Sequence, residues 1–118
     1  MTDLKPAMLS ALAHLPACCA LSFAREEMAL PIIVIGDESS RVYARADGRD
    51  YLEEYVADVD VYAGEAAEME GLCREADAAL SALGLQRIAA QDLFDDQAWA
   101  YRKRMRYRAL IRGDTIYQ

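Results

Sequence analysis

The sequence predicts an α+β fold, a single mostly antiparallel sheet of about four to five strands with one long and one short helix packed on one face. Three patterns support this prediction. An apolar stripe at helical spacing runs through residues 64–83, two segments alternate in polarity with period two, and one β-branched run does not alternate. The 118 residues, 54% of them hydrophobic, suffice for one domain spanning 1–118.

Two helices are expected, a short one near the N-terminus and a long one in the middle of the chain. Pro6 suits a first helical turn, apolar side chains continue at helical spacing to Leu15, and Pro16 ends the segment. The long helix covers 64–83, and acidic residues crowd its first turns, where the helix dipole favours negative charge. Gly84 supplies a left-handed end to this helix.

Five segments are expected to be strands, so that the overall order is α-β-β-β-α-β-β. They cover residues 17–23, 31–35, 54–63, 85–90 and 99–111. The second segment lacks alternation, which indicates burial on both faces and a central place in the sheet, and Gly36-Asp37 is expected to end it. The last two strands are joined through Asp95-Asp96 and are expected to form an antiparallel hairpin.

Residues 38–49 are polar and contain Gly48, which predicts an exposed loop. The alternative is that residues 41–43 within it are extended. A long loop rich in arginine and tyrosine on a small rigid domain suits an interface. The candidate contact residues in it are Arg41, Tyr43, Arg45 and Arg49.

The net charge of −7 is unevenly distributed along the chain. Residues 1–100 sum to −12 and residues 101–118 to +5. An acidic chain is not expected to bind nucleic acid generally or an anionic membrane, and no stretch is long and apolar enough to span a bilayer. Regions of opposite charge can join copies head to tail, bind another partner, or neutralise each other within the fold.

The last predicted strand carries a row of four arginines on one face, about 6.6 Å apart. They are Arg102, Arg104, Arg106 and Arg108. The row could pair across strands with Glu54, Asp58 and Asp60, in exposed pairs worth at most about 1 kcal/mol each. It could instead contact a protein partner or bind phosphates. Of these, we expect the partner contact.

Catalytic chemistry finds little support in the residues. His14 is the only histidine, no phosphate-binding glycine loop is present, and Cys18, Cys19 and Cys73 are expected to be reduced thiols outside any metal site. Asp58 and Asp60 share a strand face and could hold a divalent metal in a small enzyme, although a polar outer face explains them more simply. We expect no enzymatic activity, no cofactor and no bound metal.

The segment around Asp47-Gly48, residues 46–55, together with 57–63, resembles the loop-and-strand signature of phage tail-completion proteins. That family includes the tail terminators of long-tailed bacteriophages and prophages. Further similarities are the strand opened by Pro31, an acidic helix ending at residues 83–85 before Arg87, and the closing strand with Tyr101, Lys103 and Arg106-Tyr107. The resemblance covers about residues 5–112, and it departs from the family at Ala63-Gly64, where a Ser or Thr cap is common.

The resemblance implies a structural role in the virion. Tail terminators form a ring, typically of six subunits, that caps the tail tube, stops its polymerisation and presents a surface to the head–tail connector. DNA passes through the lumen of the ring only as cargo. The implied locations are the host cytoplasm during assembly and then the head-proximal end of the virion tail. The alternatives are a head-completion or other minor structural protein of the particle and, in a different class, the metal-dependent enzyme using Asp58 and Asp60.

Overall fold

The computed structural model describes residues 3–21, 29–46, 48–95, 100–113 and 115–117. Within these residues there are two helices and six strands. The helices are α1 (Lys5–Leu12) and α2 (Ala66–Ala82), and the strands are β1 (Cys18–Leu21), β2 (Ile32–Ala46), β3 (Arg49–Ala63), β4 (Gln86–Asp95), β5 (Ala100–Arg112) and β6 (Thr115–Tyr117). Neither described helix combines the length and the hydrophobicity needed to cross a bilayer.

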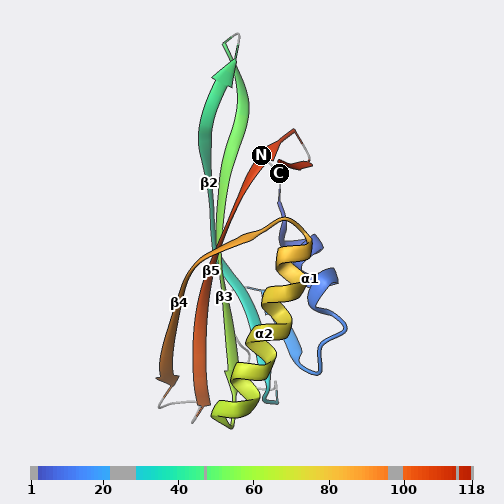
Figure 1. Cartoon of the computed structure of the whole chain (residues 1–118), viewed down its shortest axis with the longest axis vertical. Helices are drawn as coiled ribbons and strands as arrows, with labels where there is room; N and C mark the ends of the chain where they lie inside the picture. The colour runs from blue at the N-terminus through green and yellow to red at the C-terminus, as the bar shows by residue number, and fades with distance from the viewer. Residues whose placement is uncertain (1–2, 22–28, 47, 96–99, 114, 118) are drawn as a thin grey trace.

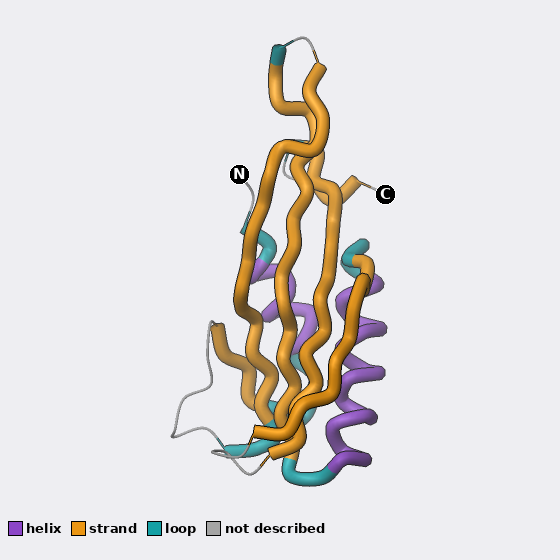
Figure 2. Tube along the Cα trace, turned by 90° about the vertical axis from the view of Figure 1, so that its left-hand side faces the viewer, coloured by secondary structure: helices purple, strands orange, loops and turns teal. Residues whose placement is uncertain are grey.

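The strands form one sheet in the order β1-β2-β3-β5-β4, with β6 paired to β5. Only β1 runs parallel to its neighbour β2, and the other described pairs are antiparallel. Both described helices cover the same face of the sheet, and neither lies on the opposite face (Figures 1 and 2). The predicted α+β class is therefore confirmed, and the short strand β6 is an addition to the strands that the sequence predicted.

The core lies between the helices and the inner face of the sheet. Tyr55, Val59, Met105 and Tyr107 are fully buried there, as the alternation in β3 and β5 predicts. Met8, Leu12, Leu72 and Leu80 from the helices pack against the same cluster. On β2, residues 32–35 are all buried, and the strand lies between β1 and β3, so the predicted central position is confirmed.

Two buried tyrosines on the inner face satisfy their hydroxyl groups through acidic side chains. Tyr107 donates a hydrogen bond of 2.7 Å to Oδ1 of Asp77 on α2, and Tyr55 donates one to Glu38 on β2. Burial raises the pKa of both hydroxyls, so they remain protonated donors. The Tyr107 bond fixes α2 over β5.

The prediction of a loop over residues 38–49 is wrong, because β2 continues through Gly36-Asp37 as far as Ala46. Asp37 has a positive φ of 48°, and the register with β3 shifts between Gly36 and Ser39. Through this irregularity the strand continues past Gly36 and Asp37, residue types that commonly end a strand. The extended alternative at 41–43 is the correct one.

The β2–β3 hairpin projects beyond the rest of the sheet as an arm, which we define as residues 39–52 (Figure 1). Gly48 has φ of 74° and provides the left-handed residue at the tip. The projection makes the molecule elongated, with extents of 52 × 24 × 23 Å. A polar sequence is compatible with a strand here because the side chains of residues 39–45 are exposed or half-buried.

Other element boundaries differ from the predicted ones by a few residues. The helix α1 ends at Leu12 rather than Leu15, and α2 begins at Ala66, where the preceding Glu65 forms no side-chain cap bond. The strand β4 extends to Asp95 and pairs antiparallel with β5, which confirms the predicted hairpin. Residues 22–23 and 96–99, on which parts of the predicted first and last strands and the predicted turn fall, lie outside the described residues.

The thiols provide a first test of this packing. Cys73 is a buried thiol outside any disulfide, and burial raises its pKa to about 11. Because the thiolate is the reactive form, Cys73 should be the slowest of the thiols to react with a disulfide reagent in the native protein at about pH 8. The Cys73→Ala variant should lose that slow phase.

All three cysteines of the chain are expected to be reduced. Unfolding the wild-type protein without reductant should therefore expose three titratable thiols. Finding a single thiol would show an intramolecular disulfide and would contradict the prediction.

Candidate functional site

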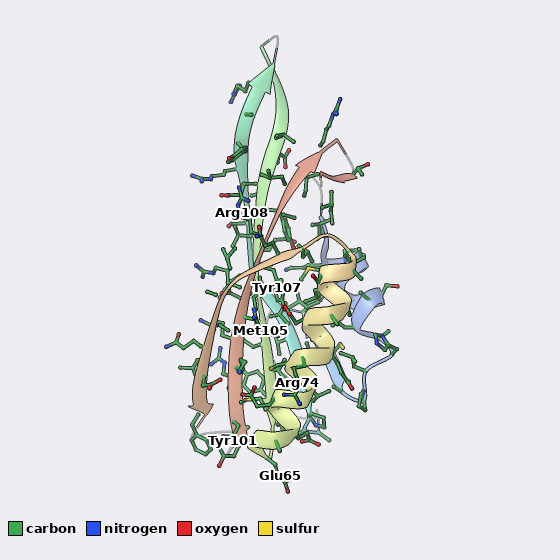
Figure 3. All side chains as sticks on the ribbon, in the orientation of Figure 1. Glu65, Arg74, Tyr101, Met105, Tyr107 and Arg108 are labelled. Atoms are coloured by element: carbon green, nitrogen blue, oxygen red, sulfur yellow. The ribbon has the colours of Figure 1, made fainter. Side chains whose placement is uncertain are left out.

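The candidate site is the face of the sheet that the helices leave uncovered. Along β5, Met105 and Tyr107 point into the core, and the arginines between and beside them occupy the opposite face, as predicted (Figure 3). We call this surface the arginine face and define it by Arg102, Arg104, Arg106 and Arg108 of β5 with Glu54, Asp58 and Asp60 of β3. Four cations and three anions thus lie on two adjacent strands.

The register of β3 with β5 brings the two charged rows together. Asp58 lies opposite Arg106, and Asp60 lies opposite Arg104. The Nε of Arg106 donates to Oδ1 of Asp58 at 2.9 Å, and the Nε of Arg104 donates to Oδ1 of Asp60 at 3.0 Å. Arg102 adds a diagonal bond of 2.6 Å from Nη2 to Oδ2 of Asp60. Cross-strand pairing is therefore a property of the fold.

The carboxylates of these pairs lie underneath the guanidinium groups. The side chains of Asp58 and Asp60 are 4% and 10% exposed, whereas that of Arg106 is 52% exposed. The expectation of exposed, weak pairs is wrong for the acidic partners, because the arginines cover them. Since a buried carboxylate without a partner is costly, the arginines are needed to keep these two aspartates in place.

Glu54 joins the arginine face to the base of the arm. It accepts a bond of 2.6 Å from Nε of Arg108 and one of 2.8 Å from Nε of Arg41. The bond from Arg108 is the main cause that holds the pKa of Glu54 below its ordinary value. The Arg108 guanidinium also lies 5.4 Å from the centre of the Tyr43 ring, a cation–π distance.

The structure brings six of the eight predicted contact residues onto one surface. These six are Arg41, Tyr43, Arg102, Arg104, Arg106 and Arg108. Arg45 is exposed farther out on the arm. Arg49 is the first residue of β3, near the tip of the arm, and its side chain is not among those that the structure describes.

Two contributors to the site were missed from the sequence. Tyr62 lies 5.2 Å below the Arg102 guanidinium, and Asp37 adds a further negative charge near Arg104 and Arg106. The alternation of β3 places Tyr62 on the face of Asp58 and Asp60, so that signal was available. Asp37 was not recognisable, because it was assigned to a strand end.

The chemistry of the surface is that of fixed, permanently charged donors. Hydrogen bonds to Asp60, Asp58 and Glu54 raise the pKa values of Arg104, Arg106 and Arg108, respectively. Asp58 and Asp60, the proposed metal ligands of the alternative enzyme, are both occupied by guanidinium groups. No cluster of three or more His, Cys, Asp or Glu side chains suited to a metal occurs in the part of the chain that the structure describes.

Comparison with known proteins matches the chain to a family. Residues 6–112 match the model of the family described as "Tail completion protein gp17". The match covers nearly the whole range over which the sequence resemblance was recognised. A search of curated proteins found no match.

The buried carboxylate of Asp60 allows a stability test. Asp60→Asn removes a negative charge held by Arg102 and Arg104 and leaves two guanidinium groups facing each other, which should cost about 1–3 kcal/mol in unfolding free energy. As a control, Asp92→Asn removes a carboxylate that is 68% exposed beside Lys103 and should cost less than about 1 kcal/mol. Equal losses in urea unfolding would refute the burial argument.

The lowered pKa of Glu54 predicts a dependence of stability on pH. A carboxyl group with a lowered folded-state pKa stabilises fully above its ordinary value of 4.5, and this contribution is lost as the pH falls through the folded-state pKa. The unfolding free energy of wild type should therefore fall more below about pH 4.5 than that of Glu54→Gln. Glu68→Gln, which changes an exposed carboxylate on α2, should follow the wild type. Parallel curves for wild type and Glu54→Gln would contradict the prediction.

Proposed function

The chain belongs to the tail completion protein gp17 family and is a structural protein of phage tail assembly, and on that premise we propose that it acts as a tail terminator. In this role, copies of the chain form a closed ring, of six subunits by the family resemblance. The ring caps the tail tube, stops its growth and presents a surface to the head–tail connector protein. Ring formation makes a second copy of the chain its first partner.

The observation that supports this proposal is the arginine face. It is a helix-free side of the sheet on which arginines are held in place by buried carboxylates and continue to the base of the arm. Arginine and tyrosine are enriched in protein interfaces, and side chains already fixed by ion pairs lose little entropy on binding. We propose as contact residues Arg41, Tyr43, Arg45, Arg49, Arg102, Arg104, Arg106 and Arg108.

Charge indicates the kind of surface that these residues meet. The face as defined carries four arginines against three carboxylates, whereas the whole chain has a net charge of −7. A neighbouring copy therefore offers acidic surface to this face, as does any acidic region of the tube. The proposed role is non-catalytic, with DNA as cargo in the lumen, assembly in the host cytoplasm, and a final place at the head-proximal end of the virion tail.

The test must leave the ion pairs intact. Reversing Arg104 and Arg106 to Glu would bring added carboxylates against Asp58 and Asp60, both buried, and would unfold the face. Ala89 of β4 is exposed opposite Arg106, so Ala89→Trp adds bulk to the same face without removing a pair. The matched control is Ala67→Trp, at an exposed position on α2.

Wild-type protein added to polymerising tail tubes should form rings and arrest tube growth, as seen by electron microscopy. Ala89→Trp should remain folded and fail to arrest growth, whereas Ala67→Trp should act as wild type. Arrest by Ala89→Trp equal to that of wild type would remove the arginine face from the tube contact. A wild-type chain that leaves tubes unaffected and instead completes isolated heads would overturn the terminator role in favour of head completion.

A further inference from the structure

We propose that the arm of one copy docks into a hollow between α1 and α2 of the next copy, with the basic side chain of Arg45 facing the carboxylate of Glu75. The inference rests on the proposed ring and assigns the contact that closes it. It concerns two features of the molecule that the arginine face does not explain, namely a projecting arm and an unfilled hollow on the helical side.

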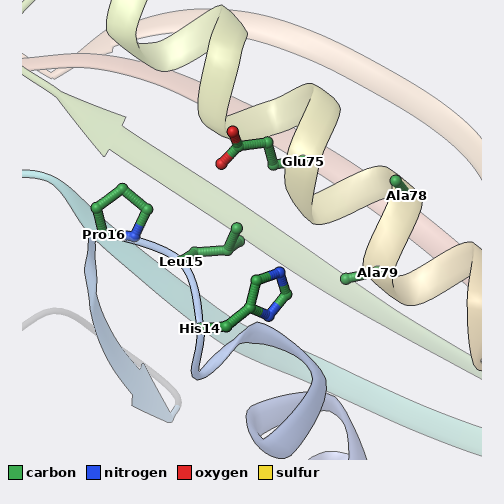
Figure 4. Close-up of a pocket in the computed structure, with 6 residues that line it drawn as sticks. All are labelled: His14, Leu15, Pro16, Glu75, Ala78 and Ala79. Atoms are coloured by element: carbon green, nitrogen blue, oxygen red, sulfur yellow. The ribbon is translucent and has the colours of Figure 1, made fainter.

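The hollow lies between α2 and the turn that follows α1, and its volume is about 590 Å³ (Figure 4). It is lined by His14, Leu15, Pro16, Glu75, Ala78 and Ala79. Ala78 and Ala79 leave room that larger side chains would fill. The volume is within the range of about 300–1,000 Å³ found for binding pockets.

Glu75 makes the rim of this hollow acidic. Its carboxylate is exposed, and no hydrogen bond or ion pair among the described residues engages it. The same is true of Glu68 on α2 and of Glu65, which precedes the helix, whereas Glu70 and Asp77 are used in contacts with β5. Two exposed carboxylates of α2, Glu68 and Glu75, are therefore available together with that of the preceding Glu65, and Arg74 is the only basic residue in the helix.

The arm has the complementary character. It contains three arginines against two aspartates, a net charge of +1 on a chain whose total is −7. Val42 and Tyr43 are 37% and 53% exposed, and Arg45 is exposed toward the tip. A projection with exposed apolar and basic side chains therefore matches a hollow that is lined mainly by Leu15, Pro16 and two alanines and carries Glu75 at its rim.

The arm is also the part of the sheet that a covering partner surface would stabilise most. From Leu52 to its tip, β3 pairs only with β2, because pairing with β5 begins at Glu53. A two-stranded hairpin is marginally stable in water, so a partner surface that covers it stabilises it. The arm points away from both helices, and it therefore meets the hollow of another copy rather than its own (Figures 1 and 2).

Such a contact joins two different surfaces and is heterologous, which yields a ring when the rotation between copies closes. A test by complementation follows. Arg45→Glu reverses the arm, and Glu75→Arg reverses the hollow. Each variant alone should weaken association about tenfold or more, because like charges then face each other at every contact.

An equal mixture of the two variants should recover assembly. Each reversed arm then meets a reversed hollow and each native arm a native hollow, which gives rings of alternating composition. Native mass spectrometry would identify them. Glu65→Arg is the matched control, since it makes the same charge change at an exposed residue just before α2 and outside the hollow lining, and it should assemble as wild type.

The outcomes separate the two proposals. Rings from either variant alone at wild-type concentrations, or failure of the mixture to recover assembly, would overturn arm docking while the wild-type ring stands. A wild-type chain that stays monomeric both alone and on tail tubes would overturn the ring and the docking together. Circular dichroism of each variant checks that loss of assembly is not loss of folding.

Discussion

The antiparallel pairing of β3 with β5 is the interaction on which the rest of the structure depends. Its register places Val59 beside Met105 on the core face and Asp58 beside Arg106 on the other face. Since side chains alternate with period two, a shift of one residue in one strand would bring charges into the core and apolar groups to the surface. The hydrophobic core and the arginine face therefore specify the same register, and each reinforces the other.

Burial gives the charged face a different character from an ordinary solvated surface. Asp58 and Asp60 lie beneath the arginines, so the guanidinium groups are both covers for buried acids and donors toward solvent. Their positions are held by the fold before any partner arrives, which reduces the entropy lost on binding. This combination suits a structural protein of phage tail assembly.

The arm follows from strand lengths that do not match. The strands β2 and β3 have 15 residues each, whereas β1 has four and β5 ends its pairing with β3 at Glu53. The hairpin carries arginines and tyrosines, and it extends the reach of a small domain. Glu54 connects it to the arginine face through its hydrogen bonds with Arg41 and Arg108.

The sequence by itself determined the two helices, the alternation in β3 and β5, the buried central strand and the face on which the arginines lie, because each depends on local periodicity. It also contained an unused signal for the arm. Arg41 and Glu54 are equally distant from Asp47-Gly48, a dipeptide typical of hairpin turns. Only the tertiary structure decided that β2 passes through Gly36-Asp37, that Asp58 and Asp60 are buried, and that a hollow forms beside Glu75. These features depend on contacts between residues far apart in the chain, since burial, register and cavities arise from packing and not from local pattern.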